Sequence, residues 1–95
     1  MAETDLTIVV CYDVVGVSTR RHIAKLLEER MVRVQRSVFE ARLTASAANR
    51  LFERAEALLE GGDSLRMYVL SRTGLEKSRA SGGAPLPEPG PYWLL

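Results

Sequence analysis

The feature that most constrains the fold is an apolar run that stops at an acid. Residues 8–12 read "IVVCY", and Asp13 follows at once. β-Branched and aromatic residues without Pro or Gly are typical of a strand, which we place at residues 6–13. Because the run is apolar on both faces, we expect both faces of this strand to be covered. Asp13 must then reach a surface or a partner, since a buried carboxylate loses its hydration.

Strand and helix periodicities alternate along the rest of the chain. The expected elements after the first strand are a helix at 20–31, two strands within 32–43, a helix between Thr44 and Gly61–Gly62, and a strand at 65–70. Ser18 or Thr19 is the expected N-cap of the first helix, and Thr44 that of the second. We expect a tight turn near residues 36–37 and a turn of helix within 73–79.

This order of elements, β-α-β-β-α-β, predicts an α+β fold of the ferredoxin-like type. Such a fold has a four-stranded antiparallel sheet with two helices on one face. We assign residues 1–79 to this domain. Residues 80–91 are rich in Gly and Pro and form a linker without regular structure, which ends in the apolar tail "YWLL" at 92–95.

Composition places the chain among globular proteins and narrows its location. Apolar residues make up 46% of the chain and charged residues 26%, and the net charge is +1. The single cysteine, Cys11, forms no internal disulfide, which fits a reducing cytoplasm. The N-terminal apolar run is too short for a membrane span, so we expect a cytoplasmic protein without membrane contact.

The position of the basic residues says more than the net charge. Seven of the 13 Lys and Arg lie between Arg20 and Arg42, and arginine grips phosphate with a planar fork. The chain has no Gly-rich phosphate loop, no zinc-binding spacing and no Ser-His-Asp set. Asp13 remains as the candidate catalytic or metal-binding residue. It either caps the first helix or pairs with Arg20 or Arg21, or it binds a hard divalent cation such as Mg²⁺.

Three sequence blocks together resemble a known family. "VVCYDV" at 9–14, "RR" at 20–21 and "RVQRSVFEARL" at 33–43 are similar to the smaller of the two universal CRISPR adaptation proteins, the CRISPR-associated endoribonucleases. The resemblance implies a ferredoxin-like homodimer with a divalent metal, Mg²⁺ or another, between the two strand-one aspartates. It also implies nuclease activity on RNA or DNA in some members. In adaptation complexes the dimer lies between two integrase dimers and holds duplex DNA.

The resemblance also assigns site residues. The resemblance implies that Asp13 is the metal ligand. Asp13 and its neighbour Tyr12 are the expected catalytic residues. The family's basic residues fall on Arg20 and Arg33, and its phenylalanine falls on Phe39. We add Arg21 and Arg36 to these expected nucleic-acid-binding residues, since Arg36 adds charge along the edge of the sheet. Phe39 either stacks on a base or packs in the core. His22 matches a basic position of some members only in part.

Two functions of different class follow, and the sequence leaves both open. One is a Mg²⁺-dependent endonuclease that acts on RNA or DNA. The other is a non-catalytic, DNA-binding dimer in the integration complex, and it is favoured by the loop "VVGVST" at 14–19, which lacks the acids of many relatives. A ferredoxin-like domain unrelated to CRISPR is a third interpretation. We expect the tail at 92–95 to add a strand to the partner subunit; the alternative is a hook for the integrase.

Overall fold

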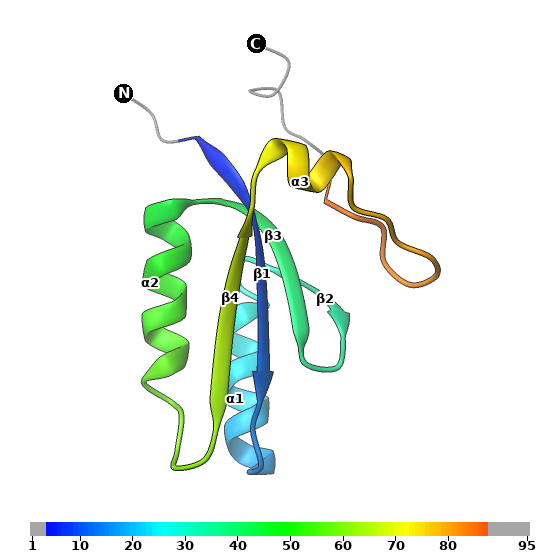
Figure 1. The fold of residues 1–95 in the computed structure, drawn as a ribbon. Coiled ribbons are helices and arrows are strands. Elements are labelled where there is room, and N and C mark those ends of the chain that lie inside the picture. The colour runs from blue at the N-terminus through cyan, green and yellow to red at the C-terminus, as the bar shows by residue number, and fades with distance from the viewer. Residues whose placement is uncertain (1–3, 88–95) are drawn as a thin grey trace.

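The computed structural model describes residues 4–87, which form one layer of strands flanked by helices (Figure 1). The elements in chain order are β1 (Asp5–Asp13), α1 (Val17–Leu27), β2 (Val32–Gln35), β3 (Val38–Thr44), α2 (Ala45–Glu56), β4 (Ser64–Leu70) and α3 (Arg72–Glu76). The expected order of strands and helices is therefore confirmed. The apolar tail at 92–95 lies outside the described residues, and residues 80–87 of the linker contain no helix or strand, as expected.

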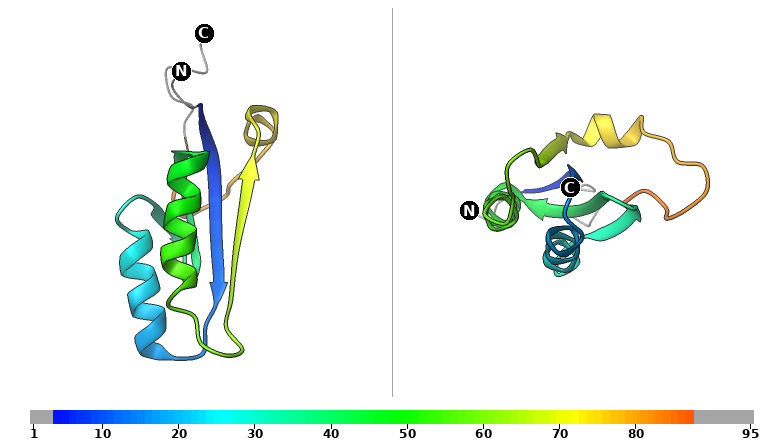
Figure 2. Two further views of the ribbon diagram at one scale, coloured as in Figure 1. Left: turned by 90° about the vertical axis from the view of Figure 1, so that its left-hand side faces the viewer. Right: turned by 90° about the horizontal axis from the view of Figure 1, so that it is seen from below.

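The sheet has the strand order β2-β3-β1-β4, and all its neighbouring strands are antiparallel. β1 lies in the interior of the sheet, where Val10 pairs with Phe39 of β3 and with Met67 of β4. α1 and α2 cover one face, which we call the helix face (Figure 2). The ferredoxin-like prediction is thus confirmed, including the tight turn at residues 36–37.

The first helix differs from the prediction at both ends. Its N-cap is Gly16, whose carbonyl accepts from the Arg20 amide at 3.0 Å, and not Ser18 or Thr19. The Thr19 side chain is buried inside the first turn instead of capping it. The helix ends at Leu27 because the amide of Glu29 bonds the carbonyl three residues back, which tightens the last turn. Thr44 caps α2 as expected, accepting from the Ala47 amide at 3.2 Å.

The core lies between the helix face and the two covering helices. Alternate residues of β1 point into it, and Ile8, Val10 and Tyr12 are all buried. The other buried apolar residues that pack with them include Ile23, Leu27, Phe39, Leu43 and Leu51. Burial of each large apolar side chain contributes about 1.5–3 kcal/mol, so this alternation fixes which residues of β1 face inward.

The opposite face, which we call the open face, is covered only at one end. It carries the odd-numbered residues of β1, from Thr7 to Asp13. α3 lies on this side of the sheet and contacts β1 and β4, with Leu75 buried (Figure 2). Thr7 is 1% exposed at the same end, whereas Tyr68 of β4 is 50% exposed. The expectation that both faces of β1 are covered therefore holds, within residues 4–87, only at the α3 end.

Candidate nucleic-acid and metal site

Asp13 ends β1 on the open face and is exposed. Its register partner on β4 is Ser64, and its carboxylate forms no hydrogen bond or ion pair with any residue of the range 4–87. The interpretation in which Asp13 caps α1 or pairs with Arg20 or Arg21 is therefore wrong. Asp13 escapes the desolvation cost because the strand alternation turns it away from the core, although its neighbours Tyr12 and Val14 are both buried.

Arg20 bonds the backbone of the loop between β1 and α1. Its Nη1 donates to the carbonyl oxygens of Val14 at 3.3 Å and Val15 at 3.2 Å. Its Nε and Nη2 donors have no partner among the described residues. The guanidinium is thus held in place by two carbonyls and keeps donors available for a ligand.

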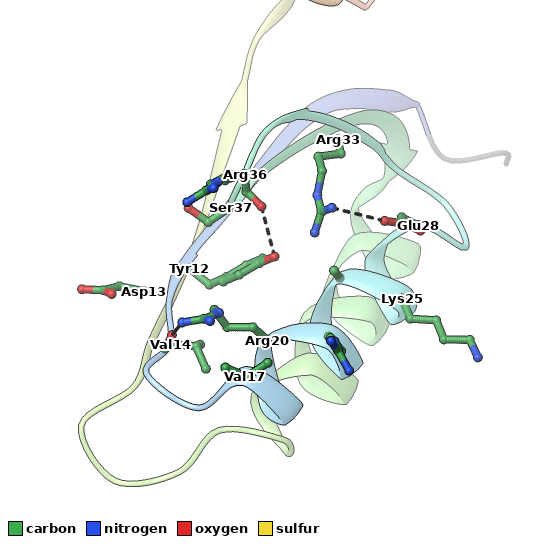
Figure 3. A pocket seen from close by; sticks show the side chains of 12 residues that line it. Tyr12, Asp13, Val14, Val17, Arg20, Lys25, Glu28, Arg33, Arg36 and Ser37 are labelled. Atoms are coloured by element: carbon green, nitrogen blue, oxygen red, sulfur yellow. Dashed lines mark hydrogen bonds and ion pairs between the residues drawn. The ribbon is translucent and has the colours of Figure 1, made fainter.

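A groove of about 900 Å³ lies between α1 and the β2–β3 hairpin on the helix side of the sheet (Figure 3). It brings together four of the five expected nucleic-acid-binding residues and adds Lys25, which the sequence analysis missed. Its basic residues are Arg20, Arg21, Lys25, Arg33 and Arg36, and its acids are Asp13 and Glu28. Asp13 only borders this groove, and its side chain points away from the arginines (Figure 3).

Arg33 is anchored at the far wall of the groove. Its guanidinium carbon lies 5.2 Å from the centre of the Phe39 ring, and its Nη1 lies 4.0 Å from a carboxylate oxygen of Glu28. Both side chains of this ion pair are about half exposed, at 46% and 53%, so the pair adds little stability. The Phe39 ring is therefore a platform for Arg33.

Phe39 itself is 0% exposed and packs in the core, where its ring centre lies 6.2 Å from that of Tyr12. Of the two roles considered for Phe39, stacking on a base is wrong for this chain. Its place on the helix face, opposite Val10 of β1, leaves no free ring surface for a ligand. The family pattern selected Phe39 as a candidate, and its burial shows that the side chain packs in the core.

Tyr12 connects β1 to the β2–β3 turn. Its amide donates to the carbonyl of Ser37 at 3.1 Å, and its hydroxyl donates to the carbonyl of Arg36 at 3.4 Å. The residue is buried, and its hydroxyl points toward the Arg36 carbonyl and away from Asp13 (Figure 3). Tyr12 and Asp13 are adjacent in sequence and lie on opposite faces, as the period of two requires. The pair is not brought together in one protomer.

Three further features at this end of the molecule escaped the sequence analysis. An oxygen of Asp63 accepts from the Val15 amide at 3.2 Å, and the Thr19 hydroxyl donates to Glu60 at 2.9 Å. These partners lie more than 40 positions apart, so no local pattern reveals the pairs. The third feature is Lys25, whose place in the groove follows from the orientation of α1. His22 is exposed and does not line the groove.

The exposed carboxylate of Asp13 is the candidate ligand for a divalent ion. Within residues 4–87 no three His, Cys, Asp or Glu side chains form a metal-binding group. A free, exposed carboxylate fits Mg²⁺, which is often held by one or two carboxylates, with water and phosphate oxygens completing its shell. Asp13 is an exposed carboxylate of this kind. In the same range no helix is long and apolar enough to span a membrane.

Comparison with known proteins supports the family resemblance that the three sequence blocks indicated. The family profile described as "CRISPR associated protein Cas2" matches residues 6–78. "CRISPR-associated endoribonuclease Cas2 2" of Synechocystis is 41% identical over 88 residues, which cover 90% of this chain and 95% of that protein.

Solved structures with the same fold include two of known assignment. Cas2 of Streptococcus pyogenes is 30% identical, with a TM-score of 0.69 over 80% of this chain and 99% of that one. A chain in a partial Cas6-RT-Cas1–Cas2 complex is 28% identical, with a TM-score of 0.68 over 85% of this chain and 90% of that one. The profile match spans far more than half of the sequence. The chain therefore belongs to the Cas2 family of CRISPR-associated proteins.

Proposed function

We propose that the chain acts in CRISPR adaptation as a homodimer that holds duplex DNA for the integrase. Membership of the Cas2 family supports the process, and the similar chain in a complex with Cas1 supports the partner. The observation that carries the binding role is the groove with its five basic side chains. Duplex DNA presents a negative charge about every 1.7 Å along its axis, so clustered arginines bind it without reading sequence.

Three features of the groove suit a phosphate backbone. Arg20 and Arg33 are held by carbonyls and by an aromatic ring, so little side-chain entropy is lost when they bind. Arg21 and Arg36 are exposed and form no side-chain bond with another residue of the range 4–87. Each guanidinium can meet a phosphate with two parallel hydrogen bonds.

The open face is the proposed dimer surface. Beyond α3 it leaves Tyr68 half exposed and Asp13 without a partner among the described residues. In this arrangement, packing of two open faces covers Tyr68 and brings an Asp13 from each protomer to the edge of the same surface. Two carboxylates with water and phosphate form a sufficient set for Mg²⁺, which is the cofactor we propose.

The free carboxylate of Asp13 also favours a second function, Mg²⁺-dependent cleavage of RNA or DNA. A Mg²⁺ ion at Asp13 would lower the pKa of a bound water molecule and polarise a phosphate. Asp13 holds the ion in this scheme, and Arg20 and Arg33 bind the backbone of the substrate. The Tyr12 hydroxyl donates to the Arg36 carbonyl at 3.4 Å, so in this scheme it orients the β2–β3 turn, and its catalytic role stays a prediction. Cleavage that needs both Mg²⁺ and Asp13 distinguishes this function from DNA holding alone.

Removing a groove arginine tests the binding role. We expect Arg33→Ala to weaken binding of a fluorescein-labelled duplex, and to reduce the slope of log affinity against log salt by about one for each phosphate that the protein no longer neutralises. Arg50→Ala is the matched control, since Arg50 is exposed on α2 and does not line the groove. Fluorescence anisotropy at several salt concentrations measures both quantities. Equal decreases in affinity for the two variants would contradict a binding role for the groove.

A further inference from the structure

A side chain in the turn between α2 and β4 holds the loop between β1 and α1 by a hydrogen bond. Val15 is 79% exposed, yet its amide donates to Oδ1 of Asp63 at 3.2 Å. The second oxygen of Asp63 accepts from the Glu60 amide at 2.9 Å. One carboxylate therefore joins two loops, through hydrogen bonds that its charge strengthens.

The turn that carries Asp63 is itself well determined. The Asp63 amide donates to the Glu60 carbonyl at 3.0 Å, which closes the turn. Gly62 has a φ of +89°, a conformation that a residue with a Cβ rarely adopts. A second tie joins the same turn to α1, because the Thr19 hydroxyl donates to a carboxylate oxygen of Glu60 at 2.9 Å. The loop and the first turn of α1 are thus held at two points.

The hydrogen bonds of Asp63 continue to the groove through a single residue. Val15 donates its amide to Asp63 and accepts at its carbonyl from Nη1 of Arg20, at 3.2 Å. The Val14 carbonyl is the other acceptor of Arg20. If the Val15 amide loses its partner, the Val14–Val15 segment gains freedom, and the two carbonyls that hold Arg20 move with it.

We infer that Asp63 is a positioning residue that holds Arg20 in the groove through the backbone of Val15. The inference rests on the proposed role of the groove in duplex binding, and it adds a residue that is not part of the groove wall. Geometry and charge predict opposite effects for removal of Asp63. Loss of a negative charge near a duplex strengthens binding, whereas release of Arg20 weakens it.

The test uses the full chain and a labelled duplex. We expect Asp63→Ala to weaken binding about fivefold, the size of one lost hydrogen bond, despite the gain of one positive unit in net charge. Asp63→Asn keeps one acceptor oxygen, so its affinity should fall between those of wild type and Asp63→Ala. Glu76→Ala is the matched control, since it removes a carboxylate that pairs with Arg72 on α3, and it should bind as tightly as wild type or more tightly. Melting temperatures verify that each variant is folded.

A double-mutant cycle separates positioning from general loosening. In an Arg20→Ala background, Asp63→Ala should cause no further loss of affinity, because the residue through which it acts is gone. An undiminished loss in that background, or an Asp63→Ala protein that binds as tightly as wild type, overturns the inference.

Amide exchange of Val15 separates this inference from the proposed function. Slow exchange in wild type and fast exchange in Asp63→Ala, with slower-exchanging core amides unchanged, supports the positioning role; equal exchange in both overturns it. If wild type binds no duplex, the proposed function fails, and the NMR signal of the Arg20 guanidinium then decides the inference. A shift of that signal in Asp63→Ala upholds it, and an unchanged signal rejects it.

Discussion

The two sides of the sheet differ in how complete they are. On the helix side, side chains of the groove have partners within the protomer. Two carbonyls accept from Arg20, and the Phe39 ring lies under the guanidinium of Arg33. The Tyr12 hydroxyl bonds the β2–β3 turn. On the open face, the Asp13 carboxylate has no partner within residues 4–87, and Tyr68 is half exposed. The proposed binding groove needs no residue from a second protomer, whereas the proposed metal site on the open face needs a second carboxylate from the partner. The comparison predicts that mutations can separate the proposed duplex binding from the proposed metal binding.

The largest expected effect comes from a charge placed on the open face. Tyr68→Lys puts a cation beside Arg66, and each protomer then brings this extra charge to the proposed dimer surface. Like charges across an interface cost several kcal/mol, so we expect a dimer of twice 10.5 kDa to become a monomer of 10.5 kDa. Light scattering at micromolar concentration measures the mass.

Leu58→Lys is the control for this change, because Leu58 is a partly exposed residue just beyond the end of α2, outside the sheet. It should leave the mass unchanged. A wild-type monomer, or a Tyr68→Lys dimer of normal strength, would contradict the assignment of the dimer to the open face.

A smaller effect is expected from an acid inside the groove. Glu28 lies 4.0 Å from Arg33, and its charge partly neutralises the arginine that we expect to bind phosphate. Glu28→Gln should therefore tighten duplex binding about two- to threefold, with a steeper dependence on salt, since exposed pairs of this kind are worth under about 1 kcal/mol.

The matched control for this variant is Glu29→Gln on the neighbouring position. Glu29 pairs with Arg54 at 3.0 Å, and the hydrogen bond from Arg54 lowers the pKa of the Glu29 carboxyl. Neither residue lines the groove, so the affinity should change less than in Glu28→Gln. An equal gain in both variants would mean that overall charge, and not Arg33, sets the affinity.

The sequence predicted the fold because the fold depends on local periods. The alternation of β1, the helical spacing of α2 and the cap at Thr44 each depend on residues a few positions apart. The family pattern selected Asp13, Arg20 and Arg33 as candidate site residues, and their roles stay predictions. What it did not predict is the side of the sheet on which each lies.

The missing parts are interactions between residues far apart in the chain. The start of α1 at Val17 depends on the loop at 14–16, which is held by Asp63 from the turn before β4. The role of Phe39 as a platform under Arg33 depends on a β2–β3 register that shifts between Arg33 and Gln35. Periods of two and 3.6 residues carry no information about such pairs.

The most direct test of separate binding and metal sites is Asp13→Asn, measured in two assays on the same preparation. Cleavage of single- and double-stranded RNA and DNA is followed with and without Mg²⁺, and duplex affinity is measured by anisotropy. The account predicts that any Mg²⁺-dependent cleavage by wild type disappears, while the duplex binds as tightly as before or slightly more tightly, since a repelling charge is lost. A loss of duplex affinity as large as that of Arg33→Ala, or cleavage as fast as wild type, would contradict it.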